Sequence, residues 1–206
     1  MFVAVRGQSA NRHSSGAVLA LEAASRGLAV SRVAVYEPAY IVDGTRRPRP
    51  GDDLAERLRA RLGQGDRDGA AALFLSEAVG VPAEVVEGVR ASQMWGWLTG
   101  LAHTLPYNVA LCGPGMVLPA GRLAAIKVPV LAIAGGVSPS WLPAAVGAAA
   151  DAIPGARYTT IDGQDDGVLN QPESLRSPLT GYFGPQAGQA GSTLPMAGTA
   201  TRSNWT

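Results

Sequence analysis

The sequence is poor in the residues on which many functional sites depend. It has one cysteine, Cys112, so an intrachain disulfide is excluded, and this side chain is expected to be a small buried hydrophobe. It has two histidines, His13 and His103, and neither lies near a second ligand at the spacing of a metal motif. We therefore expect no metal ion and no other cofactor.

The sequence also lacks charge clusters and long hydrophobic runs. Seventeen basic and sixteen acidic residues give a net charge of +1 and are spread along the chain, which argues against nucleic acid or an anionic membrane as a partner. Apolar runs such as residues 128–134 are too short to span a bilayer. Residues 1–5 do not resemble a signal peptide, so a cytoplasmic location is expected.

What remains is enough for one folded domain. The chain has 206 residues, of which 47% are hydrophobic, and this composition can bury a substantial core. After Phe183 the composition changes to glycine, proline, serine, threonine and glutamine with little periodicity. We expect a domain over residues 1–183 and a disordered tail over residues 184–206.

Strand and helix patterns alternate along the domain. Residues 6–11 are polar and predict a loop between the first strand and the first helix. The patterns predict strands over 2–5, 30–36, 128–134 and 157–161, and helices over 15–26, 54–62, 141–153 and 172–183. This alternation predicts an α/β fold with a mostly parallel sheet of about four strands.

A block of further helical patterns interrupts the alternation. Helices are predicted over 66–79, 82–91 and 93–103, between two strands. A helical insertion of this kind is typical of a lid over an active site, here over about residues 52–106. The alternative is an ordinary set of crossover helices.

The carboxyl ends of the predicted strands carry the polar residues of interest. In parallel α/β sheets this edge is where ligands bind. Ser14, Glu37, Ser138 and the pair Asp165-Asp166 all fall there.

The sequence from Arg12 to Gly16 fits four of the five positions of G-x-S-x-G, with arginine in place of the first glycine. In that motif a serine nucleophile sits on a sharp turn between a strand and a helix. Ser14 is therefore the candidate nucleophile. The alternative is that Ser14 or Ser15 only caps the helix that follows.

Several segments taken together resemble an α/β-hydrolase of the serine esterase type. The resemblance runs from about His13 to Phe183, and its motifs are His13-Ser14-Ser15-Gly16, Val35-Tyr36-Glu37-Pro38, Ala102-His103-Thr104-Leu105-Pro106-Tyr107, Val128-Pro129-Val130-Leu131 and Gly135-Gly136. It implies a partial α/β-hydrolase fold that corresponds to the carboxyl-terminal half of the family. The strands that normally precede the serine are not seen, so we expect a truncated gene product or a chain that another chain completes.

The resemblance also implies roles for individual residues. Ser14 would attack an acyl carbonyl, the Ser15 N–H would supply one oxyanion donor, and Glu37 would be the acid, its alternative being a solvated carboxylate at a strand end. The family places a histidine after the last strand, where this sequence has Gly163-Gln164-Asp165-Asp166. The base would then be Asp166 or its neighbour Asp165, or His103, which is otherwise a structural histidine.

The expected function is hydrolysis of an ester or similar small acyl substrate, impaired by the missing histidine. The alternative is a non-catalytic hydrolase remnant that acts as a binding or self-associating module, as a homo-oligomer or with a complementing chain. An apolar acyl pocket is one interpretation of several lid residues, and lid packing is the other: Met94, Trp95, Trp97, Leu98 and Leu101.

Overall fold

The computed structural model describes residues 8–44 and 48–184. The strand predicted over residues 2–5 and nearly all of the predicted tail lie outside the described residues. Within them, none of the helices is long and apolar enough to cross a membrane.

A parallel sheet forms the centre of the fold. Its four strands lie in the order β1-β2-β3-β4, and each neighbouring pair is parallel. The strands are β1 (Gln8–His13), β2 (Val30–Tyr36), β3 (Val130–Gly135) and β4 (Arg157–Ile161). The parallel sheet of about four strands predicted from the sequence is confirmed.

The position of the first strand corrects one prediction. Most of the segment expected to be a polar loop is strand β1, which pairs with β2 from Gln8 opposite Val30 to His13 opposite Tyr36. Hydrogen bonding to β2 satisfies the backbone of this segment, so the tertiary pairing overrides its polar composition. The strand therefore leads directly into the serine turn.

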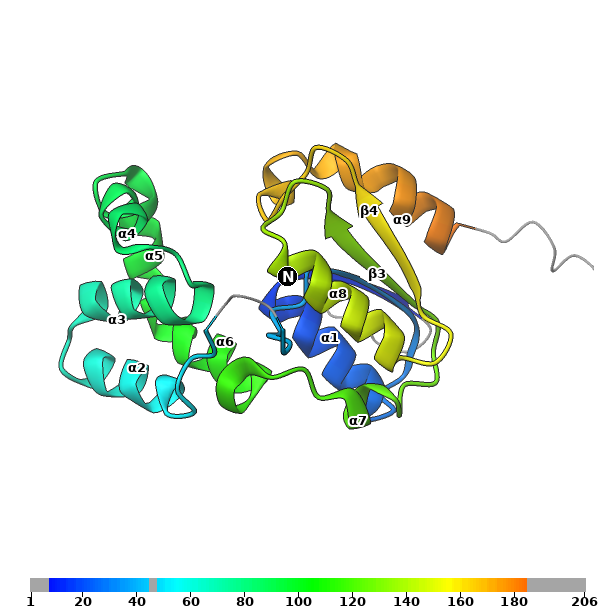
Figure 1. Cartoon of the computed structure of the whole chain (residues 1–206), viewed down its shortest axis with the longest axis horizontal. Helices are drawn as coiled ribbons and strands as arrows, with labels where there is room; N and C mark the ends of the chain where they lie inside the picture. Colours follow the sequence, from blue (N-terminus) through cyan, green and yellow to red (C-terminus); the bar gives the residue numbers. More distant parts are fainter. Residues whose placement is uncertain (1–7, 45–47, 185–206) are drawn as a thin grey trace, which may run out of the picture.

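Helices pack against the sheet in two layers (Figure 1), and alternate residues of the central strands belong to two different hydrophobic clusters. Val33 and Val35 face α1 (Ser15–Ser25) and α8 (Trp141–Ala152), within the larger hydrophobic cluster. Ala34 and Tyr36 face the opposite way, with α9 (Arg176–Phe183). The period of two is the pattern expected for strands buried on both faces.

The helical block between β2 and β3 lies to one side of the sheet (Figure 1). It comprises α2 (Leu54–Gly63), α3 (Arg67–Leu73), the π-helix η1 (Phe74–Val79), α4 (Ala83–Arg90), α5 (Gln93–Gly100), the short 3-10 helix η2 (Ala102–Thr104) and α6 (Leu105–Cys112). The chain returns to the sheet through η3 (Pro114–Met116) and α7 (Ala120–Leu123).

The block shares one core with the sheet. Leu54 and Leu58 of α2 are fully buried in the same cluster as the strands, and α6 packs against both α1 and α2. Cys112 is 1% exposed in this cluster, as the sequence predicted. Within the block, Arg57 donates two hydrogen bonds to Glu77, which ties α2 to η1.

Candidate active site

Ser14 occupies the turn between β1 and α1. Its backbone has φ 53° and ψ −125°, a conformation that residues other than glycine rarely adopt. Its N–H donates to the Tyr36 carbonyl oxygen at 3.0 Å, which fixes the turn against the end of β2. The Ser14 side chain makes no capping hydrogen bond, so helix capping does not explain this serine.

Strained backbone positions gather around one cavity. Among the described residues, three that are not glycine have a positive φ: Ser14, Glu37 and Met116, at 53°, 45° and 53°. All three line a single cavity of about 780 Å³. Strain of this kind costs on the order of 1–3 kcal/mol per residue and tends to collect at functional sites.

The cavity has an apolar wall and a polar end. The polar lining is Ser14, Ser15, Glu37, Asn108, Asp165, Asp166 and Asn170. The apolar lining comes mainly from η1 and the turn after it, from α6 and from the start of α8: Phe74, Ala78, Val79, Val81, Pro82, Val109, Cys112, Met116, Pro139, Trp141 and Leu142. Ligand sites commonly combine a mostly apolar lining with a few polar groups.

Glu37 follows β2 directly and is 1% exposed. Its Oε1 accepts hydrogen bonds from the Gly135 N–H at 2.8 Å and from the Ser138 hydroxyl at 2.5 Å. Burial raises the pKa of the Glu37 carboxyl, although the bonds from Ser138 and Gly135 act in the opposite direction. The alternative of a solvated carboxylate is therefore wrong, because this side chain is buried and held in place.

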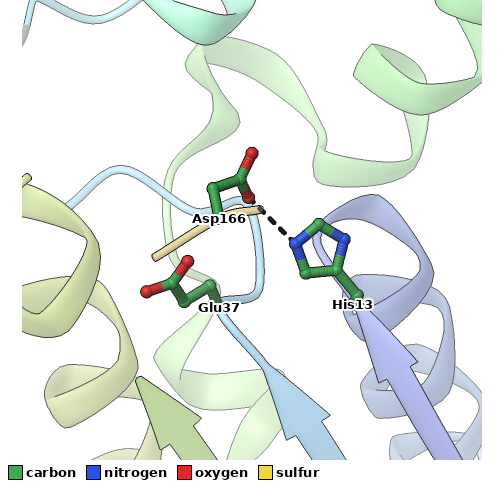
Figure 2. A group of neighbouring side chains, drawn as sticks. All are labelled: His13, Glu37 and Asp166. Carbon is green, nitrogen blue, oxygen red and sulfur yellow. Dashed lines mark hydrogen bonds and ion pairs between the residues drawn. The ribbon is translucent and has the colours of Figure 1, made fainter. Parts of the chain in front are cut away.

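Asp166 lies on the loop after β4, where the family resemblance places a histidine. Its Oδ1 is 2.9 Å from the His13 Nε2, and its side chain is 60% exposed. The loop is attached to the sheet by the Tyr36 hydroxyl, which donates to the Asp165 carbonyl oxygen at 2.8 Å. Figure 2 shows His13, Glu37 and Asp166 grouped above the ends of the strands.

Ser15 begins α1 and connects it to the helical block. Its hydroxyl donates to the Asn108 Oδ1 on α6 at 3.2 Å. The N–H of a first helical residue has no partner within its own helix, so the Ser15 N–H remains a candidate oxyanion donor.

Some candidates from the sequence do not reach the cavity. His103 lies in η2 with an exposed side chain and is not part of the lining, so the structure does not place it above Ser14. Of the two interpretations of the lid residues, the acyl pocket is wrong, because the cavity lining contains none of them: Met94, Trp95, Trp97, Leu98 and Leu101. Met94 and Trp97 are exposed, whereas Trp95 packs within the block and donates to Asp68.

Three contributors were not predicted from the sequence. Gly135 is required because a Cβ there would lie 2.4 Å from the Gln164 carbonyl oxygen. Its place in the Gly135-Gly136 pair at a strand end was the available signal. Asn108 contacts Ser15 and His13 contacts Asp166, across 93 and 153 residues of sequence, so no local sequence pattern could reveal these contacts.

Comparison with known proteins places this geometry in a wider context. No protein-family model matches the sequence, and no significant match was found among curated proteins. Solved structures do match. An alpha/beta hydrolase from Sphaerobacter thermophilus is 39% identical, with a TM-score of 0.69 over 80% of this chain and 65% of its own.

Two more distant matches agree in fold. An enol-lactonase from Burkholderia xenovorans is 18% identical, with a TM-score of 0.56 over 86% of this chain and 65% of its own. A hydrolase from Pseudomonas aeruginosa is 21% identical, with a TM-score of 0.60 over 88% of this chain and 66% of its own.

The chain thus spans slightly less than two thirds of the length of these proteins, between 65% and 66%. Three observations support the same relationship. They are the parallel sheet, the strained serine between β1 and α1, and the 39% identity. The chain is therefore a relative of the α/β-hydrolases and has an α/β-hydrolase-like fold.

Proposed function

We propose that this chain is a serine hydrolase that cleaves an ester or similar small acyl substrate, with Ser14 as the nucleophile. One observation carries the proposal: Ser14 is held in a strained turn at the wall of the cavity, and its side chain does not cap the helix it precedes. A serine in this position presents its hydroxyl to a bound substrate.

The surrounding groups support a sequence of steps. The Ser14 Oγ would attack the acyl carbon, while the Ser15 N–H stabilises the negative charge that develops on the carbonyl oxygen. The Ser14 proton would pass to the Asp166 carboxylate, which lines the same cavity, and from there to the departing alcohol. Water would then release the acyl group from Ser14.

A carboxylate is a weaker base than imidazole near neutral pH, because its ordinary pKa is about 4. Turnover would consequently be slow for a hydrolase. The cavity of about 780 Å³, with its apolar wall, favours a small acyl group over a long polar chain.

Hydrolysis of p-nitrophenyl butyrate by the full chain tests this proposal. We expect slow release of p-nitrophenol that Ser14→Ala abolishes and Ser15→Ala largely retains, since the oxyanion donor at residue 15 belongs to the backbone. EDTA in every assay removes any contribution from metal ions. Equal rates for the native chain and Ser14→Ala would reject the proposal.

The alternative function is a binding module without turnover. The observation that favours it is the carboxylate pair Asp165-Asp166 in place of the family's histidine. In that case p-nitrophenol release would match the Ser14→Ala background, while butyrate esters would still bind in the cavity.

A self-associating or complemented module is part of the same alternative. Strand β1 lies at one edge of the sheet, and among the described residues only β2 pairs with it. An unpaired edge can take up a further strand. Sedimentation velocity of the full chain would reveal such an assembly, and a monomer at all concentrations would exclude self-association.

A further inference from the structure

Three potential metal ligands meet at the polar end of the cavity. His13 ends β1, Glu37 follows β2, and Asp166 lies on the loop after β4, so three strands of one sheet bring them together. One ligand atom from each side chain lies within 4.8 Å of those of the other two (Figure 2).

The Glu37 carboxylate is incompletely satisfied. Its Oε1 accepts two hydrogen bonds, whereas its Oε2 is buried and has no hydrogen-bond partner among the described residues. Most buried polar atoms in proteins have a partner, and an unpaired carboxylate oxygen is costly to bury. A cation at this point would supply the missing interaction.

The negative charges of Glu37 and Asp166 also favour a bound cation. Two carboxylates lie together, and among the described side chains, those of residues 13–44 and 48–184, neither forms an ion pair with an arginine or a lysine. A divalent ion would offset both negative charges.

We propose that His13, Glu37 and Asp166 bind a divalent transition-metal ion, with Zn²⁺ as the best match. One imidazole nitrogen and two carboxylate oxygens are ligands that Zn²⁺ accepts, at distances of about 2.0–2.2 Å. The metal site shares Asp166 with the proposed ester hydrolysis, but it does not rest on that function and requires no reaction at Ser14.

The ligands must move closer together to bind an ion. In tetrahedral coordination with bonds of about 2.1 Å, two ligand atoms are about 3.4 Å apart, so atoms that are now up to 4.8 Å apart must approach by up to roughly 1.4 Å. Asp166 can make this movement because its side chain is 60% exposed. Its hydrogen bond with His13 would be replaced by bonds from both residues to the ion.

Three protein ligands leave at least one coordination position open. Glu37 and Asp166 both line the cavity, so the open position would face the space beside Ser14. An ion there could hold a water molecule or an oxygen atom of a ligand.

Isothermal titration of the EDTA-treated, dialysed full chain with Zn²⁺ tests this site. We expect one equivalent to bind, and Ser14→Ala to bind it equally well. His13→Gln and Asp166→Asn should weaken binding by about tenfold or more, since loss of even an outer partner of a metal ligand costs about 10–100-fold. Mg²⁺, which prefers oxygen ligands, should bind far more weakly.

Two matched variants control for adventitious binding. His103→Gln removes the other histidine, which is exposed, and Asp162→Asn removes an exposed carboxylate just after β4 that is not part of the cavity lining. Both should retain the native affinity. Absence of a one-equivalent site, or an equal loss in His103→Gln and His13→Gln, would overturn the proposal. Because Asp166 is exposed, Asp166→Asn is expected to fold, and thermal unfolding in EDTA verifies this.

Discussion

Replacing Asp166 with histidine should increase ester hydrolysis. Asp166 lies on the loop after β4, lines the cavity with Ser14, and belongs to a group that includes the buried Glu37 carboxylate. Asp166→His would therefore place an imidazole between a serine hydroxyl and a carboxylate able to orient it. This is the arrangement in which a serine is activated by a general base.

The expected gain follows from the chemistry of that position. A well-placed general base contributes about 10²–10⁴-fold to a rate. This corresponds to about 3–5 kcal/mol of activation free energy. The substitution removes an exposed ion pair with His13, which is worth about 0–1 kcal/mol at most, so the fold should survive.

The assay is p-nitrophenyl butyrate hydrolysis at pH 8 in EDTA, with kcat/KM compared between the native chain and Asp166→His. Asp165→His is the matched control, since it introduces the same imidazole one residue away, on a side chain that accepts a hydrogen bond from the Gly167 N–H. Asp166→His combined with Ser14→Ala should have no activity. A folded Asp166→His variant no faster than the native chain would refute the reasoning.

Three further predictions, each tested by urea unfolding, concern backbone strain at Ser14 and the packing of the fold. The free energy of unfolding of Ser14→Gly should be about 1–3 kcal/mol higher than that of Ser14→Ala, because glycine adopts a φ of 53° without strain. Equal free energies of unfolding would contradict this. Tyr182→Phe should stabilise the fold by about 1 kcal/mol at neutral pH, since it removes a buried hydroxyl that has no hydrogen-bond partner in the described part of the chain. Burial also raises the pKa of Tyr182 to about 12, so its ionisation leaves stability unchanged below about pH 10 and lowers it as pH rises toward 12, because the unfolded chain loses the proton first; Tyr182→Phe should reduce this loss. Leu58→Ala, at a fully buried position of α2, should cost about 2–5 kcal/mol, whereas Val85→Ala, at an exposed position of α4, should change stability by about 0.5 kcal/mol or less.

The sequence predicted the central strands well because their composition decides their structure. Residues 30–36 and 128–134 are apolar and rich in β-branched side chains, and they form β2 and most of β3. Strand β1 was missed because Gln8–His13 is polar, and its conformation depends on pairing with β2 rather than on its own propensity.

The order of the strands was enough to predict which candidate residues lie together. The carboxyl ends of parallel strands share one edge of the sheet, and this brought Ser14, Glu37 and Asp166 to the same cavity. The contact between His13 and Asp166 spans 153 residues and has no local signature. The sequence left open whether the aromatic residues of α5 line a pocket or pack within the lid, and it gave no sign that η1 and α6 supply much of the cavity lining.

The reactivity of Ser14 is the central claim, and labelling with a fluorophosphonate probe tests it most directly. Intact-mass measurement of the folded chain should show one adduct, and peptide mapping should place it on Ser14. Ser14→Ala should remain unlabelled, while Ser15→Ala should be labelled like the native chain. A folded native chain without an adduct on Ser14 would contradict the account.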